Sequence, residues 1–271
     1  MPNEDVEEEP DVPSCHVPDC TLPIDVVIKT SDAKYFGTHL QNLESYGEGF
    51  PPASLGKRKR VNYMDIEEDS DVLSLMLDFM HKQPQPDLQQ LQIKVLVRLA
   101  EAAEKYLIYS AISICRVMIG NRIPEAPLEI LGYAIKHNYH NIANKAAPLS
   151  LESSWNDARR ELGASGLILW AEYREYFHSL FRGRLYPVQF HPPFQYAPRL
   201  CSEYDIQVNV LNRLFKSPGT VLSEGWKDQQ MASVDLEHDM EPCSDCEEGL
   251  RLWLQNLVDA AELFPKFSTL L

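Results

Sequence analysis

The segment from residue 70 to residue 80 constrains the fold most, because its apolar side chains leave almost no face for water. Residues 72–80 read VLSLMLDFM, and a helix built from them is apolar on most sides. Such a helix must lie deep in a core. Asp69 precedes it as an N-cap, and the proline-rich KQPQPDL ends it. We therefore predict a buried helix at the centre of the N-terminal half.

Strands and helices are predicted on both sides of this buried helix. Apolar residues alternate over residues 24–28, which predicts a half-buried strand. A polar turn at residues 30–32 leads to a returning strand at 33–37, and a short helix follows. The alternating VNYMDIEED predicts another strand at residues 61–69. Apolar residues three and four apart over residues 99–118 predict one continuous helix.

This order of elements resembles that of the BTB/POZ domain. The matching stretches are DVVIKTSDAKYFGTHLQNLES, VNYMDIEEDSDVLSLMLDFMH and LAEAAEKYLIYSAISICRVM. The phrases EGFPPA, FMHKQPQPDL and AEAAEKYLIYSA are similar to a group of BTB-containing proteins from basidiomycete fungi, and the similarity covers about residues 24–271. The resemblance implies an α+β fold, in which a BTB/POZ-like small sheet covered by helices occupies residues 22–120. An all-helical extension would occupy residues 121–271.

The resemblance also implies a non-enzymatic protein interaction module that dimerises or docks a partner. Members of the family often act as adaptors for cullin-type ubiquitin ligases or as transcriptional regulators. The strand carrying Ile24, Val26 and Ile28 is the predicted interaction surface, because open strand edges accept pairing. The alternative is that this hairpin only packs on its own core. Leu40 follows His39 where the better-known BTB transcription factors have a basic residue, so their corepressor groove is not expected.

The C-terminal half is predicted to be helical. Residues 123–149 read as two helices separated near HNYHN, and residues 247–264 as a final helix. Residues 162–185 predict a long helix with an aromatic stripe that is more typical of a core than of a ligand site. That stripe contains Trp170, Tyr173, Phe177 and Phe181.

Charge and composition narrow the classes of partner. The chain has 40 acidic and 25 basic residues and a formal net charge of −15, which disfavours a nucleic-acid partner. There is no apolar run of about 18 residues and no signal-peptide pattern, so we expect an intracellular protein without a membrane partner. The basic stretch Lys57, Arg58, Lys59 and Arg60 resembles a nuclear localisation signal. The alternative is that it only solubilises a loop, so both cytoplasm and nucleus stay open.

One cysteine pair in the C-terminal half has the spacing of a zinc knuckle. Cys243 and Cys246 are separated by two residues, and two thiolates on a tight turn can fill adjacent vertices of a tetrahedron. Together with Cys201 and His238 they would form a Cys3His structural zinc site. The alternatives are that these cysteines are inert thiols, a disulfide or a redox pair. A redox pair is disfavoured because no strand of a βαβ unit precedes the motif. A thiol redox protein or enzyme using this pair is the alternative function.

Little else in the sequence indicates chemistry. Residues 1–21 are acidic and proline-rich, which predicts a disordered tail. Cys15, His16 and Cys20 in this tail could hold a metal, but free thiols are the favoured interpretation. The histidines, including His39 and His81, have no metal-ligand spacing and are expected to be surface or capping residues. Because neither a phosphate-binding loop nor a nucleophile elbow is present, we expect no enzymatic activity and no small-molecule substrate.

Overall fold

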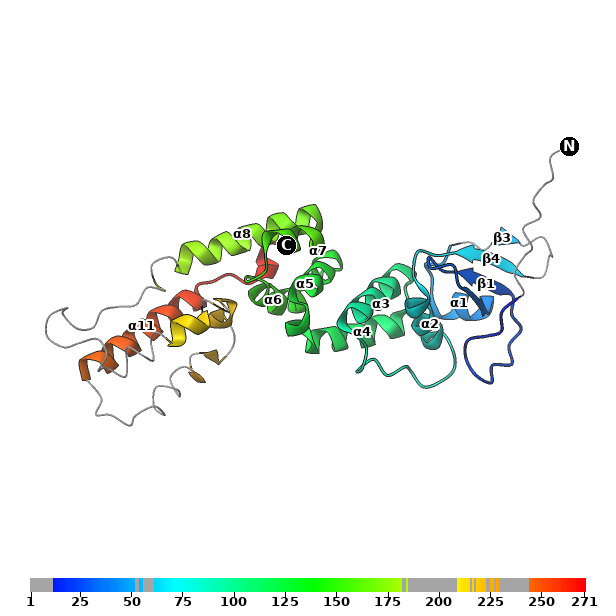
Figure 1. Cartoon of the computed structure of the whole chain (residues 1–271), viewed down its shortest axis with the longest axis horizontal. Coiled ribbons are helices and arrows are strands. Elements are labelled where there is room, and N and C mark those ends of the chain that lie inside the picture. The colour runs from blue at the N-terminus through cyan, green and yellow to red at the C-terminus, as the bar shows by residue number, and fades with distance from the viewer. Residues whose placement is uncertain are drawn as a thin grey trace. The chain divides into compact units, whose positions relative to one another are not determined.

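The computed structural model describes residues 12–51, 54–55, 61–181, 184, 209–214, 216, 218–222, 225–226, 228–229 and 244–271. The chain is mixed α+β, as the sequence predicts, and it divides into two compact units (Figure 1). Unit 1 comprises Met1–Arg122 and unit 2 comprises Ile123–Leu271. Within the described residues, no helix combines the length and the apolar composition needed to cross a lipid bilayer.

Unit 1 contains a four-stranded mixed sheet. Its strands are β1 (Val26–Lys29), β2 (Tyr35–Thr38), β3 (Ser54–Leu55) and β4 (Asn62–Asp65), in the order β2-β1-β4-β3. Strand β1 is antiparallel to β2 and parallel to β4. The hairpin and the later strand therefore form as the alternating pattern predicts.

The structure corrects the predicted interaction surface. Strand β1 pairs with β2 on one side and with β4 on the other, so it has no open edge. Val26 and Ile28 are fully buried, and Ile24 is half-buried. The prediction that these three residues form a docking surface is wrong, because parallel pairing with β4 places β1 inside the sheet. The burial of Val26 and Ile28 agrees with the alternative, that the hairpin packs on its own core.

The described part of unit 1 also contains the helices α1 (Leu40–Tyr46), α2 (Ser70–Phe79), α3 (Ile93–Tyr106) and α4 (Tyr109–Asn121) (Figure 1). Helix α2 is the predicted buried helix, and Leu73, Met76 and Leu77 are fully buried. The Asp69 side chain accepts a hydrogen bond of 3.1 Å from the Val72 backbone N–H, which confirms the predicted N-cap.

Residues 99–118 form parts of two helices and not the single helix that we predicted. Leu107 adopts φ 55° and ψ 44°, which ends α3, and the Ile108 N–H donates to the Ala103 carbonyl at 2.9 Å. This left-handed ending usually falls on glycine. Because leucine occupies the position, the break has no glycine signal, and the apolar spacing continues through it.

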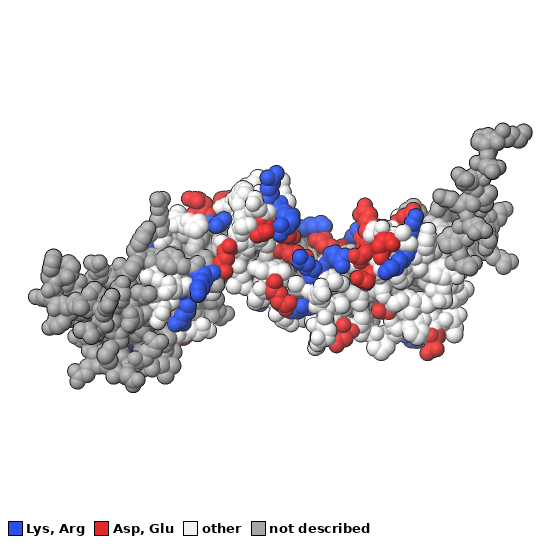
Figure 2. Space-filling model, in the orientation of Figure 1, with Lys and Arg blue, Asp and Glu red and all other residues white. Residues whose placement is uncertain are grey.

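Charged side chains of unit 1 lie close to partners of opposite sign. Lys105 contacts Glu67 and Glu68, each at 2.9 Å, and Arg98 contacts Asp69. Figure 2 shows basic side chains lying among acidic ones on this face of unit 1. The positive charge on this part of the surface is therefore locally balanced.

Unit 2 is helical in its described part. Helices α5 (Pro127–Lys136) and α6 (His140–Leu149) match the predicted pair, and α7 (Trp155–Glu161), α8 (Gly163–Phe181) and α11 (Ser244–Glu262) follow. Short 3-10 turns lie at Ile123–Glu125, Pro218–Leu222 and Phe267–Thr269.

The aromatic stripe of α8 is confirmed as core. Trp170, Tyr173, Phe177 and Phe181 are each at least 98% buried. The Trp170 indole N–H donates to Ser150 Oγ at 2.9 Å, so the buried polar atom of this ring has a partner.

Candidate metal centre

The N-terminal segment, which we define as residues 12–21, packs against the sheet. Cys15 forms a parallel β-bridge with Gly37 of β2, and the Val17 side chain is buried. Gly37 allows this approach, since a Cβ atom at this position would lie 2.2 Å from the Pro13 carbonyl oxygen. The prediction of a disordered tail through residue 21 is therefore wrong for these residues, because contacts with β2 order them.

A turn within this segment brings Cys15 and Cys20 together. The Cys20 N–H donates to the Val17 carbonyl at 3.4 Å, and Asp19 has φ 59°. Aspartate enters this left-handed region more readily than most residues do. The chain therefore reverses between the two cysteines, and both sulfurs face the same part of unit 1.

His39 lies between β2 and α1, with only 2% of its surface exposed. Its Nδ1 atom is 2.7 Å from the Pro23 carbonyl oxygen. A carbonyl oxygen can only accept a hydrogen bond, so Nδ1 carries the proton and the Nε2 lone pair is free for a ligand. That Nε2 atom lies 3.2 Å from Cys20 Sγ.

His81 has a similar arrangement just after α2. It is 5% exposed, and its Nδ1 atom lies 2.7 Å from the Leu77 carbonyl oxygen. Its Nε2 atom is 3.3 Å from Cys15 Sγ. Both imidazoles thus have the tautomer and orientation that backbone carbonyls give to metal-ligating histidines.

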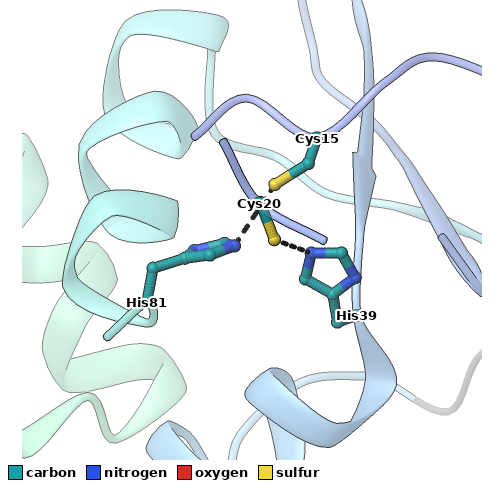
Figure 3. A group of neighbouring side chains, drawn as sticks. All are labelled: Cys15, Cys20, His39 and His81. Carbon is teal, nitrogen blue, oxygen red and sulfur yellow. Dashed lines mark hydrogen bonds between the residues drawn. The ribbon is translucent and has the colours of Figure 1, made fainter. Parts of the chain in front are cut away.

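The four side chains converge in one cluster (Figure 3). The two sulfur and two Nε2 atoms all lie within 4.8 Å of one another. In a tetrahedral zinc site, Zn–S and Zn–N bonds of about 2.3 and 2.1 Å place sulfur and nitrogen about 3.6 Å apart. The observed sulfur-to-nitrogen contacts of 3.2 and 3.3 Å are slightly shorter than this value. The cluster is therefore compatible with a zinc ion bound by two cysteines and two histidines.

Metal binding at this cluster would involve a proton. Burial raises the pKa of the Cys15 thiol above its ordinary value, and the neighbouring Cys20 sulfur raises it further, while a hydrogen bond with the Val17 backbone lowers it in part. Cys15 is thus a protonated thiol at neutral pH without a metal. A zinc ion binds the thiolate, so its binding releases this proton.

The other predicted site residues have different outcomes. Cys201, His238 and Cys243 lie outside the described residues, as does the side chain of Cys246, whose backbone belongs to α11. Lys57, Arg58, Lys59 and Arg60 lie outside them as well. His16 does not join the cluster, since its Nε2 atom is 2.8 Å from Ser74 Oγ and 3.6 Å from the Asp78 carboxylate.

Comparison with known proteins adds no assignment: no family model, no curated protein and no solved structure matches this chain. The cluster therefore rests on its own geometry.

Sequence reasoning missed two of the four donors. The C-x4-C spacing of Cys15 and Cys20 was a visible metal signal, but a disordered tail could supply no further ligands. His39 and His81 are far apart in the sequence and lack a recognisable spacing. Each lies within two residues of the end of a strand or helix with a clear pattern, and burial at such a position is the signal that could have singled them out.

Proposed function

We propose that this protein is a non-enzymatic interaction protein, whose unit 1 is a BTB/POZ-like module held together by a structural zinc ion. The element order supports this proposal, since β1, β2, α1, β4 and α2 follow the order on which the resemblance rests, and α3 carries AEAAEKY. The short strand β3 and the division of residues 99–118 between α3 and α4 depart from that order. By analogy with that family, its partner would belong to a cullin-type ubiquitin ligase or a regulatory complex.

The observation that carries the structural role is the closed donor set. Zinc in catalytic sites takes three protein ligands and keeps one position for water or substrate, whereas structural zinc has four protein ligands. Cys15, Cys20, His39 and His81 supply four, and the two imidazoles are buried. The zinc ion would join the N-terminal segment to the start of α1 and the end of α2.

Helix α4 supports an interaction role for unit 1. Its inner face carries the buried Ala111, Ile112, Cys115 and Ile119. Its outer face still carries Tyr109 and Val117, which are 58% and 63% exposed. These two apolar side chains lie beside the exposed Ser113 and Arg116, and a surface that mixes apolar with polar side chains is typical of non-obligate protein interfaces. We assign this outer face to contact with a second copy of the chain.

Native mass spectrometry of the full chain tests the zinc ion. We expect one zinc ion per chain that a strong chelator removes, and its loss in Cys20→Ala. The matched control is Cys115→Ala, which removes a buried thiol outside the cluster and should keep the ion. A wild-type chain without zinc, or a Cys20→Ala chain that retains it, would contradict the proposed site.

The same spectra test self-association. We expect a dimer for the wild type and a monomer for Val117→Glu, because a carboxylate in an apolar interface loses its hydration without gaining a partner. Ile168→Glu is the control, since Ile168 is an equally exposed apolar residue of α8 in unit 2. A wild-type monomer at micromolar concentration, or an intact Val117→Glu dimer, would refute the role of α4.

A further inference from the structure

The four donors of the cluster differ in their access to solvent. The imidazoles of His39 and His81 are 2% and 5% exposed and belong to the fold of unit 1. Cys15 and Cys20 are only half-buried, and both belong to the N-terminal segment. The two cysteines are therefore the more exposed donors of the cluster, and the two histidines are the covered ones.

The two sulfurs are also close to each other. They lie within 4.8 Å, and the turn between them already reverses the chain. A disulfide needs a sulfur-to-sulfur distance of about 2.05 Å, so the two sulfurs must approach each other by up to about 2.8 Å to form the bond. In Figure 3 both sulfurs point into the space between the two rings. The pair is therefore arranged both to bind a metal and to form a disulfide.

We propose that Cys15 and Cys20 form an oxidation site, at which a hydroperoxide converts the two zinc thiolates into one disulfide and expels the zinc ion. This inference rests on the zinc site proposed above and adds a chemical way to open it.

The chemistry balances with a hydroperoxide as the oxidant. One thiolate attacks the peroxide oxygen and becomes a sulfenic acid, while the O–O bond breaks and the leaving oxygen takes a proton to form an alcohol or water. The second thiolate attacks that sulfur, the S–S bond forms, and the sulfenic oxygen leaves as water after taking up a proton. The two sulfurs lose two electrons in total and the peroxide gains them, while zinc leaves as Zn²⁺ with its charge unchanged.

Loss of the thiolates removes the ion because the remaining donors are too few. His39 and His81 alone offer two ligands, and a disulfide sulfur carries no negative charge to hold a cation. The N-terminal segment then keeps the buried Val17 side chain and the contact between His16 and Ser74. Oxidation should therefore loosen this segment without unfolding the sheet or α2.

Cys115 provides an internal control within the same chain. Its thiol lies on α4 and is fully buried, so peroxide should not reach it while unit 1 stays folded. Selective oxidation of Cys15 and Cys20 would thus reflect their exposure and the neighbouring sulfur, and not a general reactivity of thiols.

The test uses the zinc-loaded full chain without reductant and hydrogen peroxide as the oxidant. A chromogenic chelator follows zinc release, peptide mass spectrometry locates the disulfide, and hydrogen exchange follows residues 12–21. We expect zinc release in step with a Cys15–Cys20 disulfide, unmodified Cys115, and faster exchange in the N-terminal segment. A thiol reductant with added zinc should reverse all three changes.

Two results would overturn this inference alone: zinc that stays bound while peroxide oxidises other thiols, or zinc release with sulfinic acid and no Cys15–Cys20 disulfide. A chain that holds no zinc before peroxide is added would overturn the zinc site as well, so the two failures are distinguishable. Cys20→Ala should show neither the disulfide nor the zinc release assigned to this site.

Discussion

Replacing Cys20 by alanine should remove the dependence of the stability of unit 1 on zinc. Cys20 Sγ is one of four donors and lies 3.2 Å from His39 Nε2, so the variant leaves three donors around the ion. An ion that binds only the folded state stabilises it by about 2.7 kcal/mol when the free metal is about 100 times its Kd. For a domain of about 100 residues, each kcal/mol raises Tm by about 4 °C or more. We therefore expect a zinc-dependent rise in Tm of about 10 °C for the wild type.

Scanning calorimetry of each variant, with zinc and with chelator, measures this difference directly. Cys115→Ala should lower Tm under both conditions, because it leaves a cavity in the core, but should keep the zinc-dependent rise. Cys243→Ala tests the zinc site predicted from the sequence in unit 2. If Cys20→Ala keeps the full zinc-dependent rise in Tm and Cys243→Ala loses it, the ion binds to the residues predicted in unit 2. That result would refute the zinc site at Cys15, Cys20, His39 and His81.

Three further perturbations follow from the structure. Leu77→Asp places a carboxylate at a fully buried position of α2, so it should unfold unit 1. The free energy of unfolding should fall by several kcal/mol, on the order expected for an unpaired buried charge. A native-like circular dichroism melt would contradict this. Gly37→Ala should displace the N-terminal segment, because the new Cβ would lie 2.2 Å from the Pro13 carbonyl oxygen, and should weaken zinc binding at least severalfold. Gly120→Ala is its control, since nothing lies within 4 Å of a Cβ there, and equal zinc affinity in both variants would refute the role of Gly37. Zinc affinity, measured by competition with a chelator, should fall as the pH falls, by about tenfold per pH unit for each proton released. The cause is the raised pKa of Cys15, which keeps the thiol protonated without metal. An affinity independent of pH would contradict this.

Local patterns predicted the elements of this fold well. The alternation at residues 24–28 predicted a strand and the apolar run at 72–80 a buried helix, and β1 and α2 form there. Strand β1 is not half-buried as the alternation predicted, because Val26, Val27 and Ile28 are all buried. The break at Leu107 escaped prediction because the left-handed turn there depends on packing between α3 and α4, and not on a residue that favours it.

Pairing between distant segments was harder to predict. The alternation in strand β1 is compatible with any position in a sheet. It therefore could not show whether β1 is an edge strand or an interior strand. The position is decided by β4, which pairs in parallel from more than thirty residues away. The metal cluster depends on the same long-range order, because His81 reaches Cys15 only when α2 lies against the sheet.

The separation between the first and last metal donors has a consequence for synthesis of the chain on the ribosome. Cys15 and His81 are 66 residues apart. At roughly 5–20 residues per second, Cys15 and Cys20 would wait between roughly 3 and 13 s for His81 to be translated. During this interval the nascent chain carries two thiols with an incomplete set of metal donors. The supply of zinc and of reductant near the translating ribosome would therefore decide the state of each new chain. Either zinc binds and fixes the N-terminal segment, or the Cys15 and Cys20 thiols are oxidised before zinc binds.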